Sequence, residues 1–140
     1  MKKISKLMSA VSAAVLIFVL AVFSVSASDI GIMPCSDYAT TNLSICQISG
    51  SSSIRYGCEI RGTSSVGEVK YTCQLQIKNG AWTDVPGEVF SDTRTRYVSA
   101  TKTVSATIGE EYRCKTSVKI YSTSGALLES YTRYSAGITR

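Results

Sequence analysis

Apolar and polar residues alternate along much of the chain after residue 53. A period of two is typical of β-strands that turn one face to a core and the other to water. Segments 54–62, 69–77 and 112–120 show it clearly, and segment 103–108 shows a shorter version. No helical periodicity competes with it here, so the sequence predicts an all-β fold. The predicted inward positions of the three long segments are Ile54, Tyr56, Cys58, Ile60, Val69, Tyr71, Cys73, Leu75, Ile77, Tyr112, Cys114, Thr116, Val118 and Ile120.

Two hairpin signals set the predicted register of the strands. Asn79-Gly80 is the stronger one, because both residues tolerate the positive φ of a type I′ turn. A two-residue loop makes Trp82 the cross-strand partner of Ile77 and turns Trp82 toward the core or its edge. A bulged hairpin is predicted before the last strand, and it places Glu129 opposite Lys119.

Residues 84–92 are predicted to form a loop because they contain Pro86-Gly87, and segment 94–100 follows as an edge strand. The loop carries three acidic residues, Asp84, Glu88 and Asp92. Clustered oxygens of this kind suit calcium, but their spacing matches no calcium-binding loop. A solvated loop is the preferred interpretation, and we expect no metal and no cofactor.

The N-terminal residues have the features of an export signal. Three lysines precede an apolar stretch over 11–23, and small residues end at Ala27. The apolar stretch is shorter than a membrane-spanning helix requires, so we expect cleavage after Ala27 and secretion. The lead-in segment after it has only a weak pattern, with a short first strand near 42–48. The expected parts are a signal peptide over 1–27, the lead-in segment over 28–53 and a β-sandwich domain over 54–140.

Charge and residue content narrow the functional classes. Removing Lys2, Lys3 and Lys6 from the 15 basic residues leaves 12 against 10 acidic residues, a net charge of +2. An excess this small argues only weakly for any polyanionic partner, and we expect no nucleic-acid partner. The chain has no histidine, so a catalytic triad built on histidine is excluded, and no Cys-x-x-Cys pair suggests zinc. We therefore expect a protein that is not an enzyme.

The segment around Tyr112-Arg113-Cys114 resembles the tyrosine corner of immunoglobulin domains. Cys58 precedes Cys114 by 56 residues, and Tyr71 follows Cys58 by 13 residues, near the usual place of a core tryptophan. The chain departs from the pattern because that tryptophan is missing. The resemblance implies an antiparallel sandwich of about seven strands, either immunoglobulin-like or of the fibronectin type.

Two longer motifs are similar to those of a family of small secreted proteins of Gram-positive bacteria. The first is LQ-x-x-x-G-x-W over 75–82, and the second is SG-x-x-x-ESY-x-x-YS over 124–135. The resemblance implies secretion and a β-sandwich, and it carries no activity.

Five cysteines lie after residue 27, and an odd number leaves at least one unpaired within the molecule. Alternation turns Cys58, Cys73 and Cys114 inward, so any two of them can meet. The first choice is a Cys58–Cys114 bridge across the sandwich with a local Cys35–Cys46 bridge, and the rival pairing is Cys73–Cys114.

Outward positions of the last two long strands form a candidate binding face of basic and aromatic residues. Its predicted members are Arg113, Lys115, Lys119, Tyr131 and Arg133. Such a face can bind an anionic surface polymer, such as a wall teichoic acid or an acidic glycan, or a protein partner. A plain soluble sheet face is the alternative. We expect a binding protein, with a secreted effector such as a bacteriocin-like toxin or an inhibitor as the second hypothesis.

Overall fold

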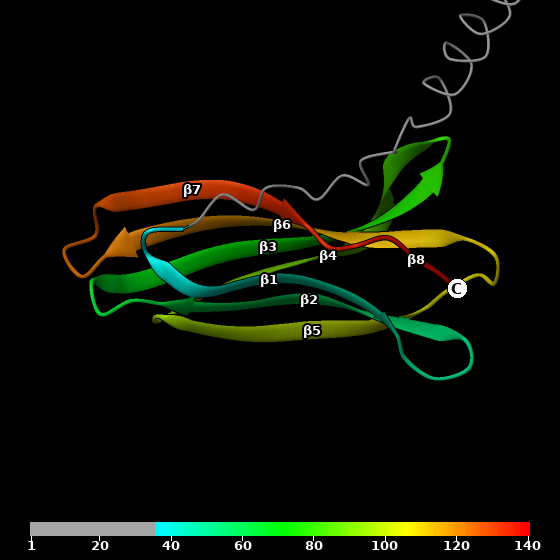
Figure 1. Cartoon of the computed structure of the whole chain (residues 1–140), viewed down its shortest axis with the longest axis horizontal. Coiled ribbons are helices and arrows are strands. Elements are labelled where there is room, and N and C mark those ends of the chain that lie inside the picture. The colour runs from blue at the N-terminus through cyan, green and yellow to red at the C-terminus, as the bar shows by residue number, and fades with distance from the viewer. Residues whose placement is uncertain (1–35) are drawn as a thin grey trace, which may run out of the picture. The chain divides into compact units, whose positions relative to one another are not determined.

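The computed structural model describes residues 36–140, which fold into eight strands in two antiparallel sheets packed against each other (Figure 1). The predicted all-β sandwich is confirmed. The strands are β1 (Ala39–Ile48), β2 (Ser53–Gly62), β3 (Val66–Asn79), β4 (Ala81–Arg94), β5 (Tyr97–Ser105), β6 (Glu111–Ser122), β7 (Leu127–Tyr134) and β8 (Ile138–Thr139).

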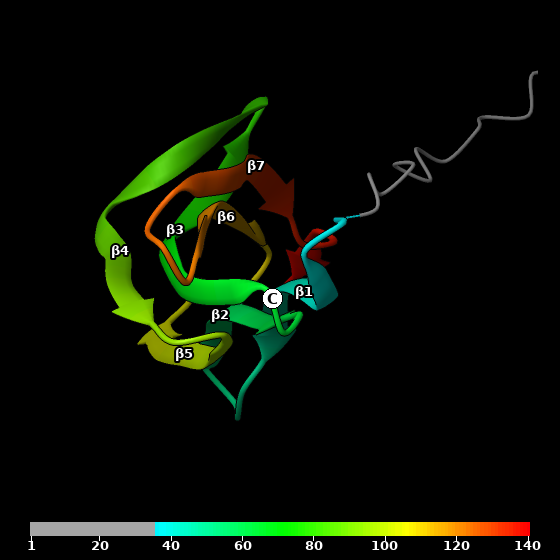
Figure 2. The same ribbon diagram turned by 90° about the vertical axis from the view of Figure 1, so that its left-hand side faces the viewer.

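The smaller sheet has the strand order β1-β2-β5, and the larger sheet has the order β4-β3-β6-β7. The short β8 pairs with the first residues of β6, beside the stretch that β7 covers. Strand β4 joins β3, whereas the corresponding strand of an immunoglobulin constant domain lies in the other sheet. The strand order therefore differs from that of an immunoglobulin constant domain. Figure 2 shows the two sheets on opposite sides of the interior, with β4 and β5 adjacent at one side.

The core consists of the inward residues of β2, β3 and β6, as the alternation predicts. Every predicted inward position of these strands is buried except Ile77, which is partly buried. Phe90 of β4 adds to this core, with its ring centroid 5.6 Å from that of Tyr56 and 6.3 Å from that of Tyr71. Two aromatic rings of the core therefore meet an aromatic ring from an edge strand.

The tyrosine corner is present between β5 and β6. The hydroxyl of buried Tyr112 accepts a hydrogen bond from the backbone N–H of Thr107, with N and O 3.1 Å apart. This bond ties the connection between the sheets to the start of β6. The alternation predicted over 103–108 does not extend to Ile108, because β5 ends at Ser105 and Ile108 is 77% exposed.

The predicted loop over 84–92 is wrong, because these residues belong to β4. A bulge absorbs Pro86-Gly87: the register shifts between Gln74 and Gln76, and Gly87 has φ of 76°. The side-chain amide of Gln74 donates to the carbonyls of Val85 and Glu88, at 3.0 and 3.1 Å, and so gives these two carbonyls of the bulge a hydrogen-bond donor. Proline is tolerated because β4 is an edge strand.

Two other sequence-based boundaries are also wrong. Segments 94–100 and 103–108 are not separate strands, since β5 runs unbroken from Tyr97 to Ser105 after a turn at Arg96. The lead-in segment is not outside the sandwich, since β1 pairs with β2 along its length. The predicted signal peptide, its cleavage site and Cys35 lie outside the described residues.

Both predicted hairpin registers are wrong by one residue. At the first hairpin Trp82 pairs with Lys78, and only Gly80 has a positive φ. At the second, Lys119 lies opposite Ser130, and Glu129 lies opposite Ile120. A shift of one residue moves side chains to the other face of a sheet, so it decides which residues lie on the candidate binding face.

Candidate functional site

The outer face of the larger sheet, which points away from the smaller sheet, carries a row of four hydroxyl side chains. Ser91, Thr72, Ser117 and Thr132 come from β4, β3, β6 and β7 and are successive cross-strand partners. The hydroxyls of Ser117 and Thr132 are 3.3 Å apart. Hydroxyls both donate and accept, so the row suits a ligand rich in hydroxyl or anionic oxygen atoms.

Lysines flank the hydroxyl row on both sides. On one side Lys70 and Lys119 are direct cross-strand partners, an arrangement that repels unless a counter-charge is near. Lys70 has one, since its Nζ lies 3.4 Å from an oxygen of Glu68 and 5.0 Å from the ring centroid of Tyr121. On the other side Lys115 lies between Gln74 and Tyr134. Within residues 36–140, neither Lys115 nor Lys119 forms an ion pair.

An open groove of about 550 Å³ runs over the hydroxyl row and the Lys70–Lys119 pair. Its lining comes from β4, β3, β6 and β7, the four main strands of the larger sheet labelled in Figure 1. The residues that line it are Lys70, Tyr71, Thr72, Ser91, Asp92, Thr93, Ser117, Val118, Lys119, Ser130, Tyr131 and Thr132. The groove is open and most of its lining residues are hydrophilic, so it fits an extended hydrophilic chain better than a compact apolar ligand.

Arg113 lies further along the same face, in contact with two aromatic rings. Its guanidinium carbon is 4.3 Å from the ring centroid of Trp82 and 4.2 Å from that of Tyr134. Its Nε donates to the side-chain oxygen of Gln76 at 2.8 Å. Gln76 is only 6% exposed and donates in turn to Asp84 at 2.7 Å. Burial lowers the pKa of Arg113, yet a guanidinium stays charged at neutral pH.

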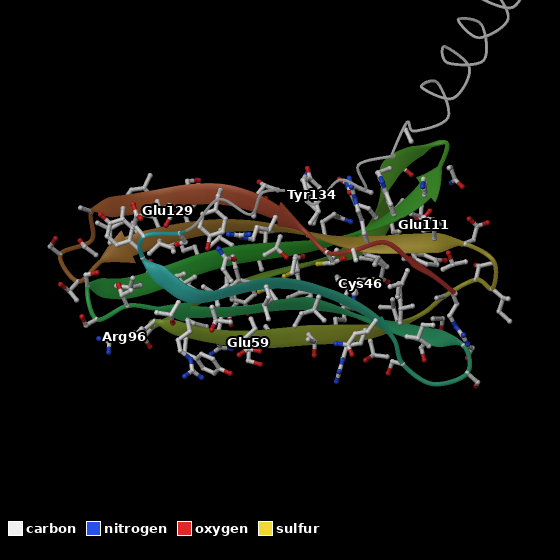
Figure 3. The ribbon with its side chains drawn as sticks, viewed as in Figure 1. Cys46, Glu59, Arg96, Glu111, Glu129 and Tyr134 are labelled. Carbon is white, nitrogen blue, oxygen red and sulfur yellow. The ribbon has the colours of Figure 1, made fainter. Side chains whose placement is uncertain are left out.

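A second cation near this stack is already neutralised. The Nζ of Lys78 lies 2.9 Å from a carboxylate oxygen of Glu111 and 5.6 Å from the ring centroid of Trp82. Figure 3 shows Glu111 and Tyr134 on the larger sheet, which identifies this end of the outer face. Lys78 is therefore less available to an anion than Arg113.

Only three of the five predicted face residues lie on the outer face: Arg113, Lys115 and Lys119. Tyr131 pairs with Val118, and Arg133 pairs with Thr116. Both partners are buried core positions, so the strand parity turns Tyr131 and Arg133 toward the smaller sheet. Burial raises the pKa of Tyr131 to about 12, as expected for an inward phenol.

Trp82 and Tyr134 were missed by the sequence-based face. A two-residue loop predicts Trp82 near the core, whereas the observed hairpin register turns it outward. Tyr134 lies outward because the bulge at the second hairpin reverses the parity of β7. The alternation of β6 itself placed Arg113 and Lys115 correctly, since its opposite face is almost wholly buried.

The predicted Cys58–Cys114 bridge is not formed, and Cys46, Cys58, Cys73 and Cys114 are all free among the described residues. The Sγ of Cys114 points to the backbone carbonyl of Gly57, 3.5 Å away, instead of to Cys58. The rival Cys73–Cys114 bridge is likewise not formed. Hydrogen bonding with Cys73, together with burial, raises the pKa of Cys114, so the Cys114 thiol is protonated at neutral pH.

Cys46, labelled in Figure 3, is the least buried of the four cysteines. Burial and the nearby Cys114 thiol raise its pKa to about 12. A thiol with a raised pKa is a poor nucleophile, so Cys46 is not activated for reaction. Its predicted partner Cys35 lies outside the described residues.

The three acidic residues of the predicted loop over 84–92 have separate partners. Asp84 accepts from Gln76, and Asp92 lies near Arg94. Glu88 accepts from Lys102 of β5 at 2.7 Å, an ion pair that joins the edges of the two sheets. Over residues 36–140 no group of three or more potential metal-ligating side chains comes together.

Comparisons with protein-family models, with curated protein sequences and with solved structures each find no match. The described part of the chain contains no helix that is long and apolar enough to cross a membrane. Any functional assignment therefore depends on the chemistry of the outer face itself.

Proposed function

We propose that this is a secreted, non-enzymatic β-sandwich protein that binds an anionic polymer of the cell surface through the outer face of its larger sheet. One observation carries the proposal: Lys115 and Lys119 form no ion pair within residues 36–140 and flank a row of hydroxyls in an open groove. Cations and hydroxyls in this arrangement complement a chain of alternating oxyanions and hydroxyl groups.

The charge of the outer face supports an anionic partner. By strand parity it presents five cations, Lys70, Lys78, Arg113, Lys115 and Lys119, against three carboxylates, Glu68, Asp84 and Glu111. Asp92 also lines the groove and is paired with Arg94. The carboxylates lie with Lys70, Gln76 and Lys78, so they leave the middle of the face positive. Ligand charge is therefore expected to matter most near β6.

The outer face of the smaller sheet offers no comparable arrangement in the described structure. Its two arginines are engaged by neighbours: Arg55 donates to Gln47 at 3.0 Å, and Arg61 lies 5.3 Å from the ring centroid of Tyr97. Leu43 and Tyr97 are the large exposed apolar residues on it. These arginines provide matched control positions, because they lie on strands of the same fold and carry the same charge.

The test compares two double charge reversals. Wild type, Lys115→Glu/Lys119→Glu and Arg55→Glu/Arg61→Glu are titrated by calorimetry with poly(glycerol phosphate), with polygalacturonate and with neutral dextran. We expect wild type to bind at least one anionic polymer and not dextran, with affinity that falls as salt is added. The Lys115/Lys119 variant should lose at least tenfold in affinity, and the arginine variant should bind like wild type.

Two results would contradict the proposal. The first is absence of binding of wild type to both anionic polymers at low salt. The second is an equal loss of affinity in the two variants, because only net charge would then matter. Circular dichroism of each variant checks that the sandwich is intact.

A further inference from the structure

Arg113 differs from the lysines of the outer face because its side chain is held in place. Two aromatic rings lie against its guanidinium, with centroids 4.3 Å (Trp82) and 4.2 Å (Tyr134) from the guanidinium carbon. The Nε bond to Gln76 fixes the rotation of the group in its plane. Gln76 is itself fixed, because it is buried and bonded to Asp84. An ordinary surface arginine loses rotamer freedom when it binds, and this one has lost much of it already.

The two terminal nitrogens of Arg113 are left for a ligand. Neither Nη atom forms a hydrogen bond with any residue of 36–140, whereas Nε does. A guanidinium that keeps both Nη groups presents two parallel donors in one plane. This is the geometry that binds two oxygens of a phosphate or a carboxylate at once.

The next cation on β6 lies at a useful distance. Lys115 follows Arg113 by two residues on the same face of the strand, about 7 Å further along. An anionic chain laid along β6 can therefore place one oxyanion at Arg113 and a neighbouring one at Lys115. Lys78, on the far side of the stack, is occupied by Glu111 and does not compete for the ligand.

Resting on the proposed function, we propose that Arg113 is the oxyanion-binding residue of the outer face. Its terminal nitrogens donate two hydrogen bonds to one phosphate or carboxylate group of the polymer. Trp82 and Tyr134 are positioning residues that hold the guanidinium in the binding orientation. Lysines Lys115 and Lys119 attract the chain by charge, and Arg113 recognises the planar pair of oxygens.

Trp82 is the single tryptophan of the chain, so its fluorescence reports on this site alone. The experiment titrates wild type with poly(glycerol phosphate) and, separately, with polygalacturonate, and follows tryptophan emission and heat together. We expect a saturable emission change with the polymer whose oxyanion binds to Arg113. The two titrations therefore distinguish a phosphate ligand from a carboxylate ligand.

Variants separate recognition from charge. Arg113→Lys keeps the charge but loses the paired donors, and we expect its affinity to fall at least fivefold. Arg113→Gln should abolish the emission change, and Tyr134→Leu should weaken binding at least threefold with all charges retained. Arg61→Lys is the matched control, since Arg61 also lies beside a tyrosine ring but on the smaller sheet, and it should bind like wild type.

The outcomes distinguish this inference from the proposed function. If a polymer binds by calorimetry while Arg113→Lys retains wild-type affinity, a point charge suffices and the inference is overturned, but the proposed function stands. Binding with no emission change, and no effect of Arg113→Gln, overturns it in the same way. If wild type binds neither polymer, the proposed function fails and this inference fails with it.

Discussion

Removing the hydroxyl of Tyr112 tests the connection between the two sheets. In Tyr112→Phe the ring stays in the core, where the tyrosine is 5% exposed, and only the hydrogen bond from the Thr107 N–H is lost. Leaving a buried donor without a partner costs about 1–3 kcal/mol. Thr107 itself is exposed, so water can reach its N–H in part. We therefore expect the free energy of unfolding to fall by about 1–2 kcal/mol, in the lower part of that range.

The assay is urea denaturation followed by circular dichroism, with reductant present so that the thiols stay in one state. Tyr97→Phe is the control, because Tyr97 is half exposed and none of the hydrogen bonds found over residues 36–140 uses its hydroxyl. It should change the free energy of unfolding by less than about 0.5 kcal/mol. The slope against urea should be the same in both variants, since neither changes the buried surface much.

A third variant measures how much the ring of Tyr112 contributes to the free energy of unfolding. Tyr112→Ala removes a large buried side chain as well as the hydroxyl, and should cost about 3–5 kcal/mol. If Tyr112→Phe proves as stable as wild type while Tyr112→Ala is strongly destabilised, the ring packs as described and the corner bond contributes nothing. That result would show that the hydrogen bond between Thr107 and Tyr112 does not stabilise the connection between the sheets.

Three further predictions concern stability. Gly57→Ala should lower the free energy of unfolding, measured in urea, by more than about 2 kcal/mol, because the added methyl group would overlap the backbone carbonyl of Ala100. A cost below about 1 kcal/mol would contradict the close approach of β2 and β5. Glu88→Ala should cost about 1 kcal/mol, since it removes the partner of Lys102 at the sheet edges, and a neutral effect would show that the pair contributes nothing. The pKa of Cys46 is about 12 in the fold and 9.0 in its ordinary state. The contribution of Cys46 to the free energy of unfolding is therefore fully present below about pH 9 and is lost as the pH rises toward 12. Cys46→Ala should reduce that fall in alkaline urea titrations, and an unchanged fall would refute the assignment.

The sequence predicts the core where strands are buried on one face and exposed on the other. Residues of β2, β3 and β6 alternate because each lies inside a sheet and packs against the opposite one. Strand β4 shows no such pattern because it is an edge strand, with most of its residues exposed. Its Pro86-Gly87 was therefore read as a loop. The amide of Gln74 that makes the bulge acceptable comes from a neighbouring strand and has no local signal.

The candidate site could be predicted only in part, because its two halves depend on different strands. Positions on β6 follow from the alternation of β6, so Arg113 and Lys115 were placed correctly. Trp82 and Tyr134 depend on hairpin register, and an error of one residue reverses their face. Turn residues allow more than one loop length, and the packing of the whole sheet decides between them. The ring stack on Arg113 therefore emerges only from the structure.

The most direct measurement for the central claim is a titration of ¹⁵N-labelled protein with the better-binding anionic polymer, followed by two-dimensional NMR. We expect backbone amides of β3, β6 and β7 to shift with a common affinity, together with the side-chain signals of Trp82 and Arg113. Amides of β1, β2 and β5 should stay unchanged, apart from those next to the core. Shifts that map instead to the smaller sheet would contradict the claim that the outer face of the larger sheet is the binding surface.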